Sequence, residues 1–250
     1  MSLHHKCLHF LKRLHRVDTL VVDKGSVQVL FSQEGVGEEQ LVHVKHLELY
    51  RLHNLKHIWK WNRHSPLNPH LIHSLQTLIV SNCPSLINMA PSSSSFQNLS
   101  SLKVSSCYGL KNLVTASTAK TMVNLTEITV EHCYKMTEIV AKDGDAAAAT
   151  EDEIIIVFNK LKSLNLSGLP NLTCFSSAVN HTFNFPSLEQ VSLVECNRMI
   201  TFCGGPLSTP KLRGIDSSNG KQWEGHLNAT ITRGLREWVR ISIGIFLLIN

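Results

Sequence analysis

The sequence predicts an α/β solenoid in which short parallel strands stack into a curved, concave sheet. One short phrase recurs along the chain at steps of roughly 24 to 36 residues: an apolar residue, any two, a second apolar residue, any one, and a third. Behind each copy, further apolar residues recur at steps of three with the same offsets. A sandwich of strands would not keep one phrase in register in this way. We expect about 7–8 irregular repeats, with mostly loops and short helical turns on the convex side.

Each copy of the phrase predicts one strand. Its apolar residues alternate with polar ones, the period of a half-buried strand. In the copy at Leu161, for example, Leu164 and Leu166 point inward while Ser163, Asn165 and Ser167 point outward. One such strand cannot bury its apolar side alone, so neighbouring copies must stack. The phrase is that of leucine-rich repeats, which predicts a horseshoe; its copies start at Val17, Val44, Leu75, Leu99, Leu125, Leu161 and Leu188, with a degraded copy at Leu212.

A small or apolar residue follows most copies, where the chain must turn inward. Cysteine takes this position four times, and free cysteine packs as a small hydrophobe. We expect these thiols to be buried and reduced, with pKa values raised by burial. The positions are Cys83, Cys107, Cys133 and Cys196, with Leu52 and Leu169 in other copies.

No motif predicts catalysis, a metal or a cofactor. The cysteines could be interpreted as metal ligands, but their identical turn positions explain them without a metal. The histidines His43, His46, His53 and His57 could also suggest a metal site, yet no cysteine or acid completes a tetrahedral set. A phosphate-binding loop of the GxxxxGK[ST] type is absent from the sequence, and so is HExxH. We therefore expect a binding surface and not an enzyme.

The pattern divides the chain into three parts. Residues 1–13 are an N-terminal flank, residues 14–231 form the repeat domain, and residues 232–250 are a C-terminal tail. An acidic, low-complexity insertion at 143–153 reads as a solvated loop. From about residue 206 the pattern decays, and we expect a terminal cap over the last core layer.

Composition and charge narrow the class of partner and the compartment. The net charge of +5 is too low to indicate nucleic-acid binding, and aromatic residues, which would stack on bases, make up only 6% of the chain. Residues 1–13 contain no apolar stretch long enough for a secretory signal, and the apolar run 241–249 is far shorter than the ~20 residues of a membrane span. Seven cysteines, an odd number, favour reduced thiols over disulfides. We expect a cytoplasmic protein with no transmembrane span.

Several features together resemble one family. They are the form LxxLxLxxCxxLxxL, the variant Ser167-Gly168-Leu169-Pro170-Asn171-Leu172, the acidic insertion before Phe158-Asn159-Lys160-Leu161-Lys162, and the closing Trp223-Glu224-Gly225-His226-Leu227-Asn228-Ala229-Thr230-Ile231. About residues 14–231 resemble the C-terminal repeat region of plant intracellular nucleotide-binding leucine-rich-repeat immune receptors of the coiled-coil class. The resemblance implies a role in defence, in which the repeats sense a pathogen effector or a modified host protein. It also implies a nucleotide-binding domain, in cis or in trans, as a second partner.

The chain departs from that family in two respects. It contains no nucleotide-binding motif, so nucleotide binding does not carry over, and after Ile231 it no longer resembles the family's acidic tail. We therefore expect a fragment or truncated relative of an immune receptor. Two alternatives are the substrate-recognition repeat of a ubiquitin-ligase adaptor, which usually follows an F-box, and an extracellular receptor repeat, which prefers Asn at the turn.

The candidate binding site follows from the strand alternation. Outward positions of the strands are not needed for the core, so they are free to serve recognition of a protein ligand. They are His46, Glu48, Tyr50, Thr77, Ile79, Ser81, Ser101, Lys103, Ser105, Glu127, Thr129, Glu131, Ser163, Asn165, Ser167, Gln190, Ser192 and Val194.

Overall fold

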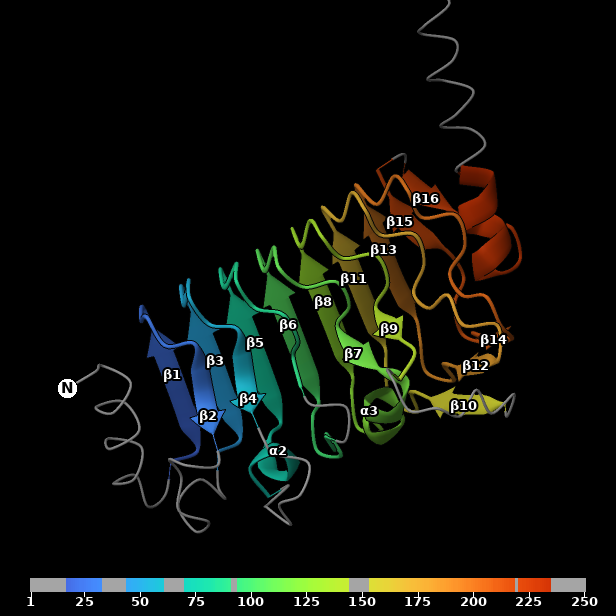
Figure 1. The fold of residues 1–250 in the computed structure, drawn as a ribbon. Coiled ribbons are helices and arrows are strands. Elements are labelled where there is room, and N and C mark those ends of the chain that lie inside the picture. Colours follow the sequence, from blue (N-terminus) through green and yellow to red (C-terminus); the bar gives the residue numbers. More distant parts are fainter. Residues whose placement is uncertain are drawn as a thin grey trace, which may run out of the picture.

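The computed structural model describes residues 17–32, 44–60, 70–90, 94–143, 153–218 and 220–234. Over these ranges the chain winds as a solenoid, and each turn adds one strand to a long sheet (Figure 1). The sheet contains, in order, β1 (Thr19–Asp23), β3 (His46–Tyr50), β5 (Thr77–Ser81), β6 (Ser101–Ser105), β8 (Glu127–Glu131), β11 (Ser163–Ser167), β13 (Gln190–Val194), β15 (Ile215–Ser217) and β16 (Gly220–Gln222). All neighbours are parallel except β15 and β16, which are antiparallel. The predicted solenoid is confirmed, and each strand lies in one predicted copy of the phrase, except β16.

The strands pair in step, so equivalent residues of successive repeats stand side by side. Leu47 pairs with Leu78, and Leu78 pairs with Leu102. Each of these leucines is at most 1% exposed. Because the inward residues of one strand lie against those of the next, the apolar positions form one continuous core along the solenoid.

A sharp corner follows each strand of the long sheet from β1 to β13. The first residue after the strand has a left-handed backbone, as at Ser106 (φ 52°) and His132 (φ 53°). In the corners from Lys24 to Gly168 its N–H donates to the carbonyl at the end of the next strand, so the corner continues the ladder of hydrogen bonds. After β13, Glu195 N–H donates instead to Ser218 Oγ at 3.1 Å. The next residue then points into the core, where Cys83, Cys107 and Cys133 are each 0% exposed. The predicted inward turn position is therefore correct.

The convex side carries more strand than the sequence pattern predicted. Besides the short helices α2 (His70–Ser74) and α3 (Ala116–Thr121), neighbouring turns pair there through short parallel strands. The pairs form because adjacent turns run parallel, and because β-branched residues such as Val114, Val140 and Ile156 favour extended backbone. The strands are β2 (Val29–Ser32) with β4 (His57–Lys60), β7 (Val114–Thr115) with β9 (Val140–Ala141), and β10 (Ile154–Val157) with β12 (His181–Asn184) and β14 (Leu207–Ser208).

The last repeat is closed by β16 and by a helix over residues 227–234. Leu227 and Ile231 of this helix are buried against the core. Residues 1–13, the insertion between Asp143 and Glu153, and the tail beyond residue 234 lie outside the described ranges.

Candidate functional site

All the outward positions predicted from the sequence lie on the side of the long sheet that faces away from the core. We call these eighteen residues the sheet face. Gln190 is exposed and the others are half-buried, while the residues between them are buried. In-step pairing arranges them in three rows across the strands. The structure thus brings together side chains that are far apart in the sequence.

Polar contacts between neighbouring strands fix several of these side chains. Lys103 Nζ lies 3.2 Å from Glu127 Oε2, and Ser101 Oγ donates to the same carboxylate at 3.4 Å. Asn165 Nδ2 donates to Glu131 Oε1 at 3.3 Å. These contacts hold the charged groups in place before any partner arrives.

At the N-terminal end, an ion pair and a tyrosine shape the sheet face. Arg51 Nε donates to Asp23 Oδ1 at 2.8 Å, and this hydrogen bond lowers the pKa of Asp23. Tyr50 donates its hydroxyl to Glu48 Oε2 at 2.9 Å. Burial, reinforced by the hydrogen bond to Glu48, raises the pKa of Tyr50.

Two strands extend the sheet face beyond the residues that we predicted. On β1, Val21 is 52% exposed and pairs with Glu48, and on β15 the exposed Asp216 pairs with Ser192. The signal for both was present in the weak copies of the phrase at Val17 and Leu212. With β1, β15 and β16 included, this side of the long sheet carries Lys103 and Lys221 against the carboxylates Asp23, Glu48, Glu127, Glu131 and Asp216. Lys221 pairs with Asp216 across the strands, and Arg51 forms an ion pair with Asp23. Acidic side chains still outnumber basic ones there, in contrast to a chain of net charge +5.

Cys83, Cys107 and Cys133 pack in successive turns of the core, and the pKa values of their thiols shift in different directions. The thiols of Cys83, Cys107 and Cys133 each donate to the carbonyl two residues earlier, at 3.6, 3.4 and 3.4 Å. Hydrogen bonds with Cys133 and Cys83, together with burial, raise the pKa of Cys107. Burial raises the pKa of Cys196 to about 11. We expected burial to raise the pKa of all four thiols. This expectation is wrong for Cys83 and Cys133, because the hydrogen bond with Cys107 lowers the pKa of each.

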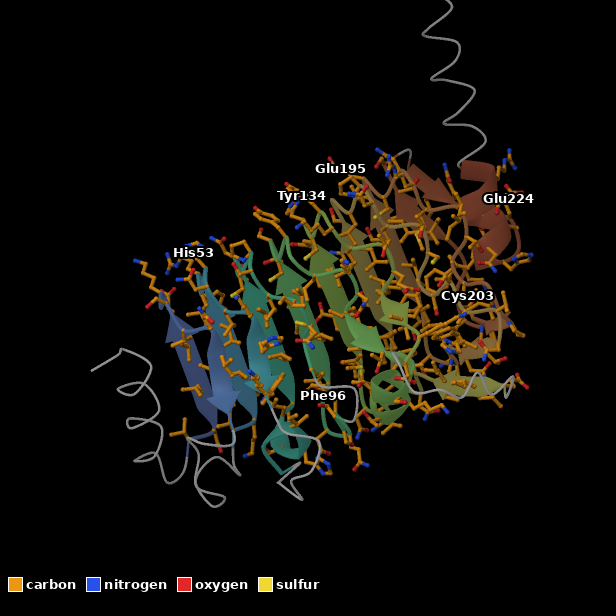
Figure 2. The ribbon with its side chains drawn as sticks, viewed as in Figure 1. His53, Phe96, Tyr134, Glu195, Cys203 and Glu224 are labelled. Carbon is orange, nitrogen blue, oxygen red and sulfur yellow. The ribbon has the colours of Figure 1, made fainter. Side chains whose placement is uncertain are left out.

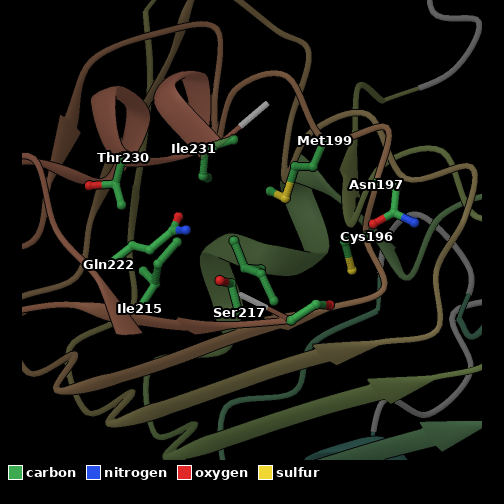
Figure 3. Close-up of a pocket in the computed structure, with 11 residues that line it drawn as sticks. Cys196, Asn197, Met199, Ile215, Ser217, Gln222, Thr230 and Ile231 are labelled. Carbon is green, nitrogen blue, oxygen red and sulfur yellow. The ribbon is translucent and has the colours of Figure 1, made fainter. Parts of the chain in front are cut away.

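A cavity of about 90 Å³ lies between the last repeat and the terminal helix (Figure 3). Cys196, Met199 and Ile215 line it from the repeat, and Thr230 and Ile231 line it from the helix. It is much smaller than the ~300–1,000 Å³ of typical ligand pockets. Within the ranges that the structure describes, no group of three or more His, Cys, Asp or Glu side chains is placed to hold a metal ion. The helices described there include none long and apolar enough to cross a membrane.

Comparison with known proteins agrees with this geometry. Residues 3–95 and 90–203 match the family described as plant disease resistance protein RPS2-like, leucine-rich repeats. A probable disease resistance protein of Arabidopsis thaliana, At4g14610, is 32% identical over 148 residues, which cover 59% of this chain and 18% of that protein. The matched region is thus a small part of that relative's length. No solved structure matches the chain. The repeat phrase, the solenoid and the family match together show that the chain belongs to the leucine-rich-repeat family of RPS2-like plant disease resistance proteins.

Proposed function

We propose that this chain is a non-catalytic recognition module of plant defence, in which the sheet face binds a protein ligand. The ligand is a pathogen effector or a host protein that an effector has modified. Such a module works in the cytoplasm and regulates a nucleotide-binding domain supplied in cis or in trans. The resemblance to intracellular receptors and the family match support this role.

The observation that carries the proposal is the sheet face itself. It is a broad surface whose side chains are not needed for the core, and contacts such as Lys103–Glu127 already hold its charged groups in place. Charge on a pre-positioned surface gives specificity and association rate in protein recognition. The residues of the sheet face span six neighbouring strands, an extent that suits a protein ligand and not a small molecule.

A charge-reversed sheet face tests the proposal. The triple variant Lys103→Glu/Glu127→Lys/Glu131→Lys changes side chains that lie outside the core, so we expect its circular dichroism and its thermal unfolding to stay close to those of the unchanged chain. A pairwise binding screen against secreted pathogen proteins and their host targets supplies the ligand, and titration calorimetry measures its affinity. We expect the triple variant to bind roughly tenfold more weakly or worse.

A control on the convex side is Lys120→Glu/Lys142→Glu, which changes exposed charges away from the sheet face. It should bind like the unchanged chain. A ligand that binds the triple variant at full affinity would disprove recognition by the sheet face. Unfolding of the triple variant would instead contradict the assignment of these side chains to the solvent side.

A further inference from the structure

A second surface lies along the edge of the solenoid where the strands of the long sheet end. In five successive turns a ring-bearing residue occupies the same position, three residues beyond the strand. Figure 2 shows His53 and Tyr134 along this edge. We call the set the ring ridge; it comprises His53, Pro84, Tyr108, Tyr134 and Pro170.

The backbone of each turn fixes the ring ridge. Leu110 N–H donates to the Cys107 carbonyl at 3.2 Å, and Met136 N–H donates to the Cys133 carbonyl at 3.0 Å. Each bond closes a tight turn that places the tyrosine at its first central position, while the preceding cysteine is buried. The ridge residues therefore project from a rigid, regularly spaced backbone.

Close packing between turns adds to this rigidity. A Cβ at Gly109 would come within 2.6 Å of the Leu86 carbonyl oxygen, so only glycine allows these turns to approach so closely. On the other side, Asn171 Nδ2 donates to the Tyr134 carbonyl at 2.7 Å. A partner would lose little entropy in ordering such a surface.

At the centre of the ridge two tyrosine rings stack in the open. The rings of Tyr108 and Tyr134 are 5.0 Å apart and tilted by 7°, and their residues are 39% and 47% exposed. His132 packs edge-on against Tyr134 at 6.5 Å. Tyrosine combines a large apolar surface with a hydroxyl that donates to acceptors, and it is enriched at the energetic centres of protein interfaces.

The charged residues that follow the ridge positions in the chain are mostly positive. Lys56 and Lys111 come three residues after His53 and Tyr108, and Lys135 comes directly after Tyr134. All three lysines are exposed, and no ion pair joins any of them within the described parts of the chain. Arg198 is also exposed and donates to Asn171 Oδ1 at 2.9 Å. Glu195 is the acidic residue in these turns, at the C-terminal end of the row (Figure 2). Tyrosine hydroxyls and lysine ammonium groups are all donors to carboxylates.

We propose that the ring ridge is a second docking surface, separate from the sheet face, and that its partner is an acidic, extended protein segment. Carboxylates of the segment accept from Lys111, Lys135 and the two tyrosine hydroxyls, and its apolar parts lie on the rings. Successive turns are about 4.8 Å apart, so the ridge is about 20 Å long, which is the length of about six extended residues. The cations are too few and too widely spaced to favour a nucleic-acid backbone over such a segment.

The test uses the whole chain and three labelled probes of defined chemistry: a hexaglutamate peptide, a hexalysine peptide and an octathymidylate. Fluorescence anisotropy measures binding at ~150 mM salt, where long-range charge attraction is screened. We expect hexaglutamate to bind best. Lys111→Glu/Lys135→Glu should weaken its binding roughly tenfold, and Tyr108→Ser/Tyr134→Ser should weaken it roughly fivefold.

Two further variants separate this surface from general charge effects. Lys120→Glu/Lys142→Glu makes the same change of net charge on the convex side and should leave hexaglutamate binding unchanged. The sheet-face triple variant should also leave it unchanged, so failure here and failure of the proposed function are distinguishable. The proposal is wrong if octathymidylate or hexalysine binds as well as hexaglutamate, or if the convex control loses as much affinity as the ridge variants. The ridge and convex variants change exposed side chains, and the triple variant changes half-buried side chains on the side of the sheet away from the core. Circular dichroism verifies that each variant is folded.

Discussion

At the scale of single residues, the tightest constraint is the corner after each strand. Its left-handed backbone suits glycine or asparagine, and Gly168 and Asn82 occupy it in two repeats. Elsewhere Ser106, His132 and Glu195 adopt the same conformation. The hydrogen bonds of the neighbouring strands impose the corner on these residues against their own preference.

Buried thiols are the second feature of single residues, and they link stability to pH. Burial raises the pKa of Cys196 to about 11 from an ordinary 9.0. Between these values the unfolded chain has released the proton and the folded chain still holds it. The unfolded state then binds fewer protons, so the free energy of unfolding falls as the pH rises from 9 to 11.

We predict that Cys196→Ala makes this alkaline decline shallower, because one group that ionises only on unfolding is removed. Urea unfolding at intervals between pH 8 and pH 11 measures the slope for both chains. The variant is less stable at every pH, since it loses packing, but the comparison concerns the slope alone. Parallel curves would mean that Cys196 ionises equally in both states.

At the scale of elements, the terminal helix supplies hydrogen-bond partners to backbone groups of the last repeat, which no further turn follows. In the inner repeats the convex backbone bonds to the next turn, as where Ile139 N–H donates to the Phe175 carbonyl and Phe175 N–H donates to the Phe202 carbonyl. Phe202 has no such turn to follow it. The side chain of Asn228 takes that place: its Oδ1 accepts from Phe202 N–H at 2.7 Å and Cys203 N–H at 3.2 Å, and its Nδ2 donates to the Cys203 carbonyl at 3.2 Å.

We predict that Asn228→Ala destabilises the last repeat by about 1–3 kcal/mol, the cost of leaving buried donors without an acceptor. Hydrogen exchange should accelerate at the amides of Phe202 and Cys203 and remain unchanged at β3. Asn228→Asp is the comparison variant: it keeps an accepting oxygen for Phe202 N–H and Cys203 N–H, but it places a carboxylate oxygen against the Cys203 carbonyl. We expect Asn228→Asp to retain more protection at the Phe202 and Cys203 amides than Asn228→Ala, and unchanged exchange at these amides in Asn228→Ala would contradict closure by Asn228.

At the scale of the whole molecule, the solenoid is a row of layers that contact mainly their neighbours. The phenylalanine cluster shows this pattern, since Phe175 stacks on Phe202 of the next turn at 4.8 Å and meets Phe158 edge-on at 6.3 Å. A core substitution in one layer should therefore destabilise mainly that layer and the two layers beside it.

We predict that Leu164→Ala costs about 2–5 kcal/mol, since Leu164 is 1% exposed in the middle of the core. Hydrogen exchange should rise in β11 and in β8 and β13, which both pair with β11, and far less in β3. Ser163→Ala, on the opposite side of the same strand, should change stability by less than about 0.5 kcal/mol. A uniform rise along all the strands would contradict the layered description.

The sequence by itself determined the solenoid, the strand positions and the side of each strand that faces the core. It could do so because the repeat phrase and the period of two are local patterns, visible within single turns such as Leu164-Asn165-Leu166. The sheet face was predictable for the same reason, and Asp216 was missed where the phrase is degraded.

Only the tertiary structure decided which residues of different turns meet. The stack of Tyr108 on Tyr134, the bond from Asn165 to Glu131, the closure of the last repeat by Asn228 and the convex strand pairs all join residues of different turns. The lowered pKa of Cys83 and Cys133 depends on the same stacking. The repeat phrase aligns equivalent positions of successive strands, but the segments between the phrases differ in length and composition. Which side chains and convex backbone groups of different turns bond to one another therefore depends on the folded chain.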